Sequence, residues 1–137
     1  MVVAVKNTIE KMVETEEIDS KDGYAHVNYA THLRWYEDGH RALLDQAGVG
    51  FVALQQRGLR TFIRAANVEY LRELKAGDRI KIETAVERVG RTSMVYNQRI
   101  LANDALSSRA KMTAVFVDAH GKPTAIPEDV KYSLVKV

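Results

Sequence analysis

The sequence predicts an α+β fold in which an antiparallel sheet wraps around one long helix. Three observations predict it: helical spacing of apolar residues over 28–46, alternating apolar and polar residues in several later stretches, and short turn sequences between those stretches. One amphipathic helix has enough apolar surface to cover one face of a curved sheet. With 46% apolar residues in 137, we expect residues 1–137 to form a single domain.

The N-terminal part predicts an edge strand and then a polar loop. Apolar residues are sparse and charged residues frequent from Ile9 to Ile18, which favours a strand at the edge of the sheet. Residues 19–24 combine Asp, Ser and Gly, which are typical of turns. We therefore expect the loop to lie directly before the long helix.

The long helix is predicted from Asn28 to Gln46. Residues of one buried face recur at spacings of three and four: Leu33, Tyr36, His40, Leu43 and Ala47. Asn28 is a favourable N-cap and Gly48 a favourable stop. Gly39 in the interior costs roughly 1 kcal/mol relative to Ala, which indicates close packing against another backbone. A second, shorter helix is predicted over Phe51–Gln56, ending at Gly58.

The second half of the chain predicts four strands. They are Thr61–Leu71, Asp78–Val89, Thr92–Leu101 and Arg109–Asp118. Turn residues at Ala76-Gly77, Gly90-Arg91 and Asn103-Asp104 predict hairpins, so we expect an antiparallel meander that ends in a tail after Gly121 and Pro123. Because a small sheet with exposed edges can lengthen by pairing between subunits, we expect a homodimer or homotetramer.

Composition excludes several classes of function. The absence of cysteine excludes disulfides, thiolate metal sites and a thiol nucleophile. The 20 basic and 18 acidic residues are scattered, which predicts no nucleic-acid partner. The apolar start Met1–Val5 is too short for a signal or a membrane span, so we expect a cytoplasmic protein with no membrane partner.

One stretch, residues 22–37, carries a more specific pattern. It reads Asp22, then His26-Val27-Asn28, then Leu33-Arg34-Trp35-Tyr36-Glu37. This pattern resembles the loop-to-helix signature of hotdog thioesterases of the 4-hydroxybenzoyl-CoA and acyl-ACP kind. The likeness continues through residues 66–72, 77–78, 89–93, 115–118 and 126–127.

The resemblance implies a hotdog fold, acyl-CoA or acyl-ACP substrates, and active sites near subunit interfaces, with no metal or cofactor. It also implies that Asp22 attacks the thioester carbonyl or activates a water, while the backbone N–H of Tyr29 forms the oxyanion hole. The N-terminus of a helix carries roughly +0.5 charge, which suits a developing oxyanion. The predicted reaction is hydrolysis of an acyl thioester to a carboxylic acid and a thiol.

Other residues of the signature keep two interpretations each. His26 either orients the carboxylate or moves a proton, or it only packs in the loop. Asn28 caps the helix and so fixes the oxyanion hole, or it contacts substrate. Tyr24 stands where acyl-ACP enzymes have Asn, so a full Asp-Asn-His arrangement is not implied.

Rival carboxylates are Asp19, on the same loop, and Glu37, on the helix. Glu37 lies nine residues beyond Asn28, roughly 13 Å along the helix axis, so an ion-paired surface role is its simplest interpretation. His32 and His40 are eight residues apart, too far for a two-histidine metal pair, and we expect both to be packing residues.

The sequence offers candidates for contacts with the CoA part of the substrate and with its acyl group. Arg91 and Ser93 in the Gly90-Arg91 turn are candidates for binding the substrate, and Arg88, Arg91 and Lys75 for binding CoA phosphates. Four aromatic residues are candidates for an acyl pocket or for ordinary core positions: Tyr24, Trp35, Phe51 and Phe62.

Two other functions fit the same fold. A non-catalytic acyl-CoA-binding module would use the same pocket without turnover, because a fold alone does not fix an activity. A hydratase or dehydratase would require a differently placed acid–base pair, which this signature does not suggest.

Overall fold

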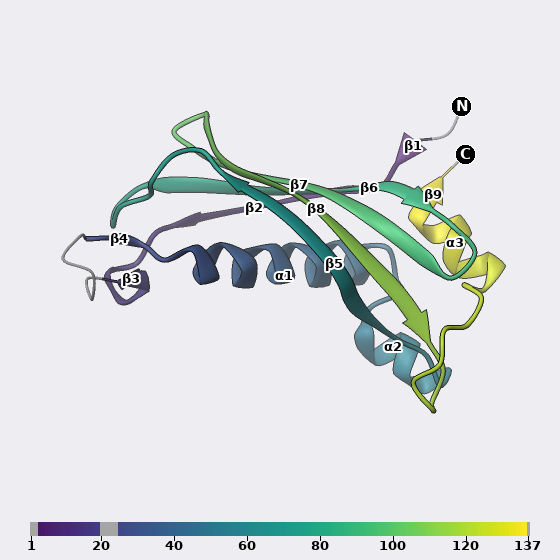
Figure 1. Ribbon diagram of the computed structural model, residues 1–137. Coiled ribbons are helices and arrows are strands. Elements are labelled where there is room, and N and C mark those ends of the chain that lie inside the picture. The colour runs from purple at the N-terminus through teal and green to yellow at the C-terminus, as the bar shows by residue number, and fades with distance from the viewer. Residues whose placement is uncertain (1–2, 20–24, 137) are drawn as a thin grey trace.

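A long helix, α1, lies against one face of a five-stranded antiparallel sheet (Figure 1). The computed structural model describes residues 3–19 and 25–136. Its elements are β1 (Val3–Ala4), β2 (Lys6–Met12), a 3₁₀ turn (Thr15–Glu17), β3 (Ile18–Asp19), β4 (His26–Val27), α1 (Tyr29–Gln46), α2 (Phe51–Gln56), β5 (Arg60–Tyr70), β6 (Arg79–Val89), β7 (Ser93–Ala102), β8 (Ala105–Val117), α3 (Glu128–Leu134) and β9 (Val135–Lys136). The predicted α+β hotdog arrangement is confirmed.

The strand order in the main sheet is β2-β6-β7-β8-β5, with every pair antiparallel. The two predicted hairpins β6–β7 and β7–β8 are confirmed. In the second hairpin, β7–β8, the turn residues Asn103 and Asp104 both have positive φ (51° and 66°), as a tight turn between twisted strands requires. The predicted strand boundaries hold to within one or two residues, except that β8 begins at Ala105, four residues earlier than expected.

The meander prediction was wrong for β5. This strand pairs with β8, at the far edge of the sheet, instead of with its successor β6. Leu74, in the link between them, is fully buried, and the N–H of Gly77 donates to the carbonyl of Val13 at 2.9 Å. The link is therefore bonded to β4 and to the residue after β2 and does not close a hairpin, while β2 pairs with the free edge of β6.

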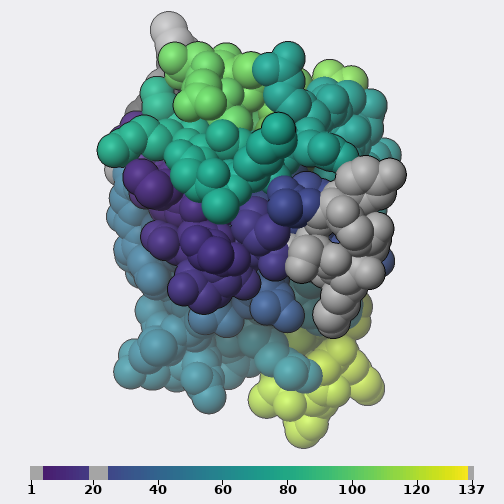
Figure 2. Space-filling view, turned by 90° about the vertical axis from the view of Figure 1, so that its left-hand side faces the viewer, coloured from purple at the N-terminus to yellow at the C-terminus, as the bar shows by residue number. Residues whose placement is uncertain are grey.

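The first strand also differs from its prediction. It is an edge strand, as expected, but it covers Lys6–Met12 instead of Ile9–Ile18. Val13 is buried, and the chain then turns through Thr15–Glu17, where Glu14 and Glu17 form a reciprocal capping box. Figure 2 views the molecule from the side at which α1 begins, and the N-terminal segment lies there between the strands above and the helices below.

Helix α1 matches its prediction, from its N-cap at Asn28 to the positive φ of Gly48. Its buried face packs on β6, β2 and β7. At Gly39 a Cβ atom would collide with Thr84 Oγ1 and would lie 3.0 Å from Gln98 Nε2. The close approach is therefore to side chains of the sheet, and not to another backbone as expected.

The C-terminal segment is ordered structure instead of the predicted tail. After Pro127 the chain forms α3, which buries Val130 and Leu134 one helical turn apart. β9 then pairs with β1, so the two ends of the described chain lie side by side (Figure 1). Within the described residues, no helix combines the length and the apolar character needed to cross a bilayer.

Candidate active site

Two short strands converge on the start of α1. β3 pairs with β4, with Asp19 opposite His26, and β4 leads directly into the helix. The N–H of Val27 donates to the carbonyl of Leu74 at 3.0 Å, which attaches β4 to the link before β6. Both ends of the loop between β3 and β4 are thereby anchored beside the first turn of α1.

Asn28 caps the helix, as the sequence predicts. Its backbone is extended (φ −66°, ψ 147°) and its side-chain oxygen accepts the N–H of Ala30 at 2.8 Å. The carbonyl of Asn28 accepts the N–H of Thr31 at 3.0 Å. Among the residues that the structure describes, nothing accepts a hydrogen bond from the N–H of Tyr29. Within the part of the chain that the structure describes, the amide of Tyr29 is thus left as a donor, whereas the amide of its neighbour Ala30 is engaged by Asn28.

The candidate catalytic carboxylate of the loop lies outside the residues that the structure describes. Asp22 and Tyr24 fall in the undescribed segment 20–24, and of Asp19 only the backbone is described. His26, on β4, is half-buried and lies two residues before Asn28. The structure thus brings His26, Asn28 and Tyr29 together at one end of α1.

Arg91 and Ser93 lie elsewhere. Arg91 lies in the turn between β6 and β7, and Ser93 is the first residue of β7; the carbonyl of Arg91 accepts the N–H of Ile126 at 2.8 Å, close to α3. Figure 1 shows this turn at the end of the sheet opposite to the start of α1, a helix about 27 Å long at 1.5 Å per residue. Within one subunit they do not meet Tyr29. Of the three cations considered for CoA phosphates, only Lys75, next to Leu74, lies near the helix start.

A buried group of three polar side chains lies next to the start of α1. Ser108 Oγ lies 2.8 Å from His32 Nδ1 and 2.6 Å from the hydroxyl of Tyr36. Burial lowers the pKa of His32 to about 4 and raises the pKa of Tyr36. Both groups are therefore neutral near pH 7. His32 is a packing residue, as expected, but its serine partner on β8 has no signal in the sequence near the helix.

A cavity of about 420 Å³ opens between α1 and β5. Its lining residues are Leu33, Glu37, His40, Phe51, Thr61, Phe62, Ile63, Ala66, Tyr96 and Met112. Phe51 and Phe62 therefore line a pocket, which is one of the two interpretations that the sequence left open for them. Trp35 does not, because it is buried in the core and its indole N–H donates to Glu17 Oε2 at 2.9 Å. Glu37 is exposed and forms an ion pair with Arg41 at 2.9 Å, the surface role expected for it.

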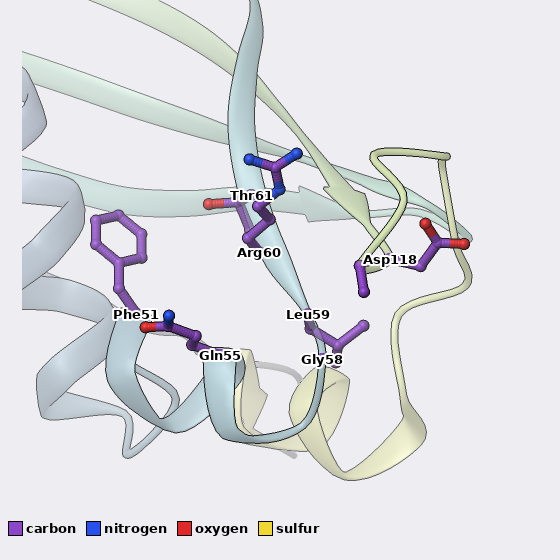
Figure 3. A pocket seen from close by; sticks show the side chains of 8 residues that line it. Phe51, Gln55, Gly58, Leu59, Arg60, Thr61 and Asp118 are labelled. Atoms are coloured by element: carbon purple, nitrogen blue, oxygen red, sulfur yellow. The ribbon is translucent and has the colours of Figure 1, made fainter.

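A second cavity, of about 390 Å³, lies at the outer end of β5 (Figure 3). Phe51 and Thr61 line both cavities, so the two adjoin. Asp118 on its rim accepts the backbone N–H groups of His120 and Lys122, which lowers the pKa of this carboxyl. That carboxylate is engaged by its own turn, so this cavity offers mainly shape and apolar surface.

Comparison with known proteins agrees with this geometry. Residues 13–134 match the model of the thioesterase-like superfamily, and the chain belongs to that family. It is therefore a member of the thioesterase-like superfamily, and its antiparallel sheet laid along one long helix is the predicted hotdog fold.

Individual relatives are distant. An acyl-CoA thioester hydrolase, YbgC, from Escherichia coli O6:H1 is 28% identical over 106 residues, covering 76% of this chain and 79% of the relative. The chloroplastic acyl-acyl carrier protein thioesterase ATL2 of Arabidopsis thaliana is 26% identical over 125 residues, 90% of this chain, which spans 65% of that relative's length. A crystal structure of a hypothetical protein from Aquifex aeolicus superposes with a TM-score of 0.84 at 21% identity, covering 93% of this chain and 98% of that one.

Proposed function

We propose that this protein is an acyl-CoA thioesterase, which hydrolyses an acyl-CoA to a carboxylic acid and the CoA thiol. The observation that carries the proposal is the start of α1, where Asn28 engages the amide of Ala30 and no described residue accepts from the amide of Tyr29. Family membership and the activity of the Escherichia coli relative, an acyl-CoA thioester hydrolase, support the same reaction.

The Tyr29 amide is the proposed oxyanion hole. Attack on a thioester carbonyl moves negative charge to its oxygen, and a fixed N–H at a helix N-terminus stabilises that charge. Loss of one such donor typically costs about 3 kcal/mol of barrier. Asn28 acts in this proposal as the cap that fixes the first turn, and it is not required to contact substrate.

Asp22 is the proposed catalytic carboxylate, as nucleophile or as general base for water. Support comes from the signature and from the pairing of β3 with β4, which anchors both ends of the loop beside the helix start. His26, at the end of that loop, is proposed to orient the carboxylate or to move a proton. Whether Asp22 acts as nucleophile or as general base, water supplies the oxygen of the new carboxylic acid, and a proton goes to the departing thiolate.

The cavity between α1 and β5 is the proposed acyl pocket. Its volume of about 420 Å³ falls in the usual range for small-ligand sites. Phe51, Phe62 and Met112 give it apolar walls, which favours an aliphatic or aromatic acyl group over a charged one.

We also propose a homodimer, or a homotetramer built from it, that pairs through β5. This edge strand exposes Phe62 (50%), Ile63 (42%) and Tyr70 (43%), an apolar row that is unusual for a free edge. A second subunit on this edge would cover that row. Arg91 and Ser93 remain proposed substrate contacts only through the remote end of CoA or a partner subunit, because they lie far from Tyr29 in their own chain.

A substrate panel tests the function. Purified protein is mixed with short, long and aromatic acyl-CoAs and a thiol reagent, and each acyl group is also offered on acyl carrier protein. We expect release of CoA thiol, faster than release from the carrier protein. No release from any thioester contradicts the proposal; binding without turnover would indicate a binding module, and water addition to an enoyl-CoA would indicate a hydratase.

A further inference from the structure

Tyr70, the last residue of β5, reaches across to the first residue of α1. Its hydroxyl donates a hydrogen bond to the backbone carbonyl of Tyr29 at 3.2 Å. The two aromatic rings also meet edge to face, with centroids 6.2 Å apart and planes at 78°. The edge strand and the helix start are therefore joined by one polar and one aromatic contact.

This contact completes the fixation of both peptide groups next to Tyr29. The peptide group after Tyr29 is held at two points, because its carbonyl accepts from Tyr70 and its N–H, that of Ala30, donates to Asn28 Oδ1. The peptide group before Tyr29 is held by its carbonyl, which accepts the N–H of Thr31. Since a peptide group is planar, the bond to the Asn28 carbonyl fixes the plane that contains the Tyr29 N–H. The two bonds to the next peptide group fix the plane on the other side of the Tyr29 Cα, which restricts rotation between the two planes.

Tyr70 is itself held in place by contacts with β8 and with His32 of α1. Its backbone is in register with Ser108 of β8, and the next amide, that of Leu71, donates to the carbonyl of Ser107 at 2.8 Å. Its ring packs edge-on against His32, with centroids 5.1 Å apart and planes at 82°. His32 Nδ1 in turn lies 2.8 Å from Ser108 Oγ. Movement of the Tyr70 hydroxyl would disturb this packed group.

We propose that Tyr70 is a positioning residue, which aims the Tyr29 N–H at the thioester oxygen by holding the Tyr29 carbonyl. The inference rests on the proposed thioesterase function, and it adds a residue that acts through the oxyanion hole without touching the reacting atoms. An oxyanion donor acts mainly in the transition state, so its alignment affects the chemical step more than substrate binding.

The test is Tyr70→Phe, which removes the hydroxyl and keeps the ring against Tyr29 and His32. We expect kcat on the best acyl-CoA to fall about fivefold, the usual effect of one neutral hydrogen bond, with KM changed by less than about twofold. Tyr132→Phe, on the exposed surface of α3, is the matched control and should keep both constants. A wild-type kcat in Tyr70→Phe, or a change in KM alone, overturns the inference.

A second measurement does not depend on turnover. Hydrogen–deuterium exchange at the amides of Ala30 and Thr31 reports how firmly the first turn is held, and it should quicken in Tyr70→Phe and stay unchanged in Tyr132→Phe. Unchanged exchange overturns the inference. If the wild-type protein hydrolyses no thioester, the proposed function fails, and exchange still decides whether Tyr70 holds the turn.

Discussion

Gln98 Oε1 accepts a hydrogen bond from His40 Nε2 at 2.7 Å in the centre of the fold. The amide nitrogen of Gln98 donates to the carbonyl of Tyr36 and to Thr84 Oγ1, so its oxygen faces His40 and the proton of the neutral imidazole lies on Nε2. The His40 ring stacks on Tyr96, with centroids 4.2 Å apart. Helix and sheet are thus joined by a buried polar cluster, and burial, more than the bond to Gln98, disfavours a charged His40.

Stability should fall as the pH is lowered from about 6.5 to about 4. Burial lowers the pKa of both His32 and His40 to about 4 in the folded protein, from an ordinary 6.5. The unfolded chain binds more protons in this window, so the free energy of unfolding decreases there, by about 3 kcal/mol for each histidine as an order of magnitude.

Urea denaturation at a series of pH values measures this effect. His120 is exposed on a turn, so His120→Gln should leave the profile unchanged. A free energy of unfolding that stays level from pH 7 to pH 4 would contradict neutral burial of the two histidines.

Gly39→Ala should destabilise the protein. Alanine favours a helix interior over glycine by about 1 kcal/mol, but its Cβ would collide with Thr84 Oγ1. Overpacking of this kind costs about 1–3 kcal/mol, so we expect a net loss in thermal or urea denaturation. Adding Thr84→Ala removes the colliding atom and should recover part of the loss; a stabilised single variant would show that the sheet yields at this point.

Asp22→Asn should lose turnover and keep the fold. General acid–base groups contribute about 100-fold or more, so kcat should fall by at least that factor while circular dichroism is unchanged. Asp38→Asn, on the exposed side of α1, is the matched control. Retained turnover in Asp22→Asn would transfer the assignment to Asp19 or Glu37.

Ile63→Lys should weaken self-association. The substitution places a charge in the exposed apolar row of β5, and charged edges resist strand pairing. Sedimentation velocity should show a smaller species than the wild type. Thr8→Lys places the same charge on the opposite edge strand β2 and should leave the association state unchanged. An unaltered assembly in Ile63→Lys would exclude β5 as the pairing edge.

Elements with local signals could be predicted from the sequence, and those set by distant partners could not. Helix α1 has a cap, a periodic face and a stop within one stretch, so its bounds were predicted almost residue for residue. The partner of β5 depends on the buried link around Leu74 and on β2 occupying the edge of β6. Neither the burial of Leu74 nor the place of β2 can be inferred from the residues of β5 itself. Helix α3 did have local signals, Pro127 with two acids and the pair Val130 and Leu134, which the prediction of a tail overlooked.

The candidate site divides in the same way. The signature marks Asp22, His26, Asn28 and Tyr29 because they are close in sequence, and the structure confirms the cap at Asn28. Tyr70 and Ser108 lie 41 and 76 residues from their partners Tyr29 and His32, so only the folded chain brings them to the helix start. Arg91 was a candidate because phosphates favour Arg on loops, and Ser93 because it follows the same turn. The fold places the connection between β6 and β7 at the end of the sheet opposite to the start of α1.

The central claim is that the amide of Tyr29 receives the thioester oxygen. A crystal structure of the Asp22→Asn variant with a bound acyl-CoA measures the distance from that oxygen to Tyr29 N directly. We expect about 3 Å, with the acyl group in the cavity beside Phe51 and Phe62. A thioester bound away from the start of α1, with its oxygen on other donors, would contradict the account.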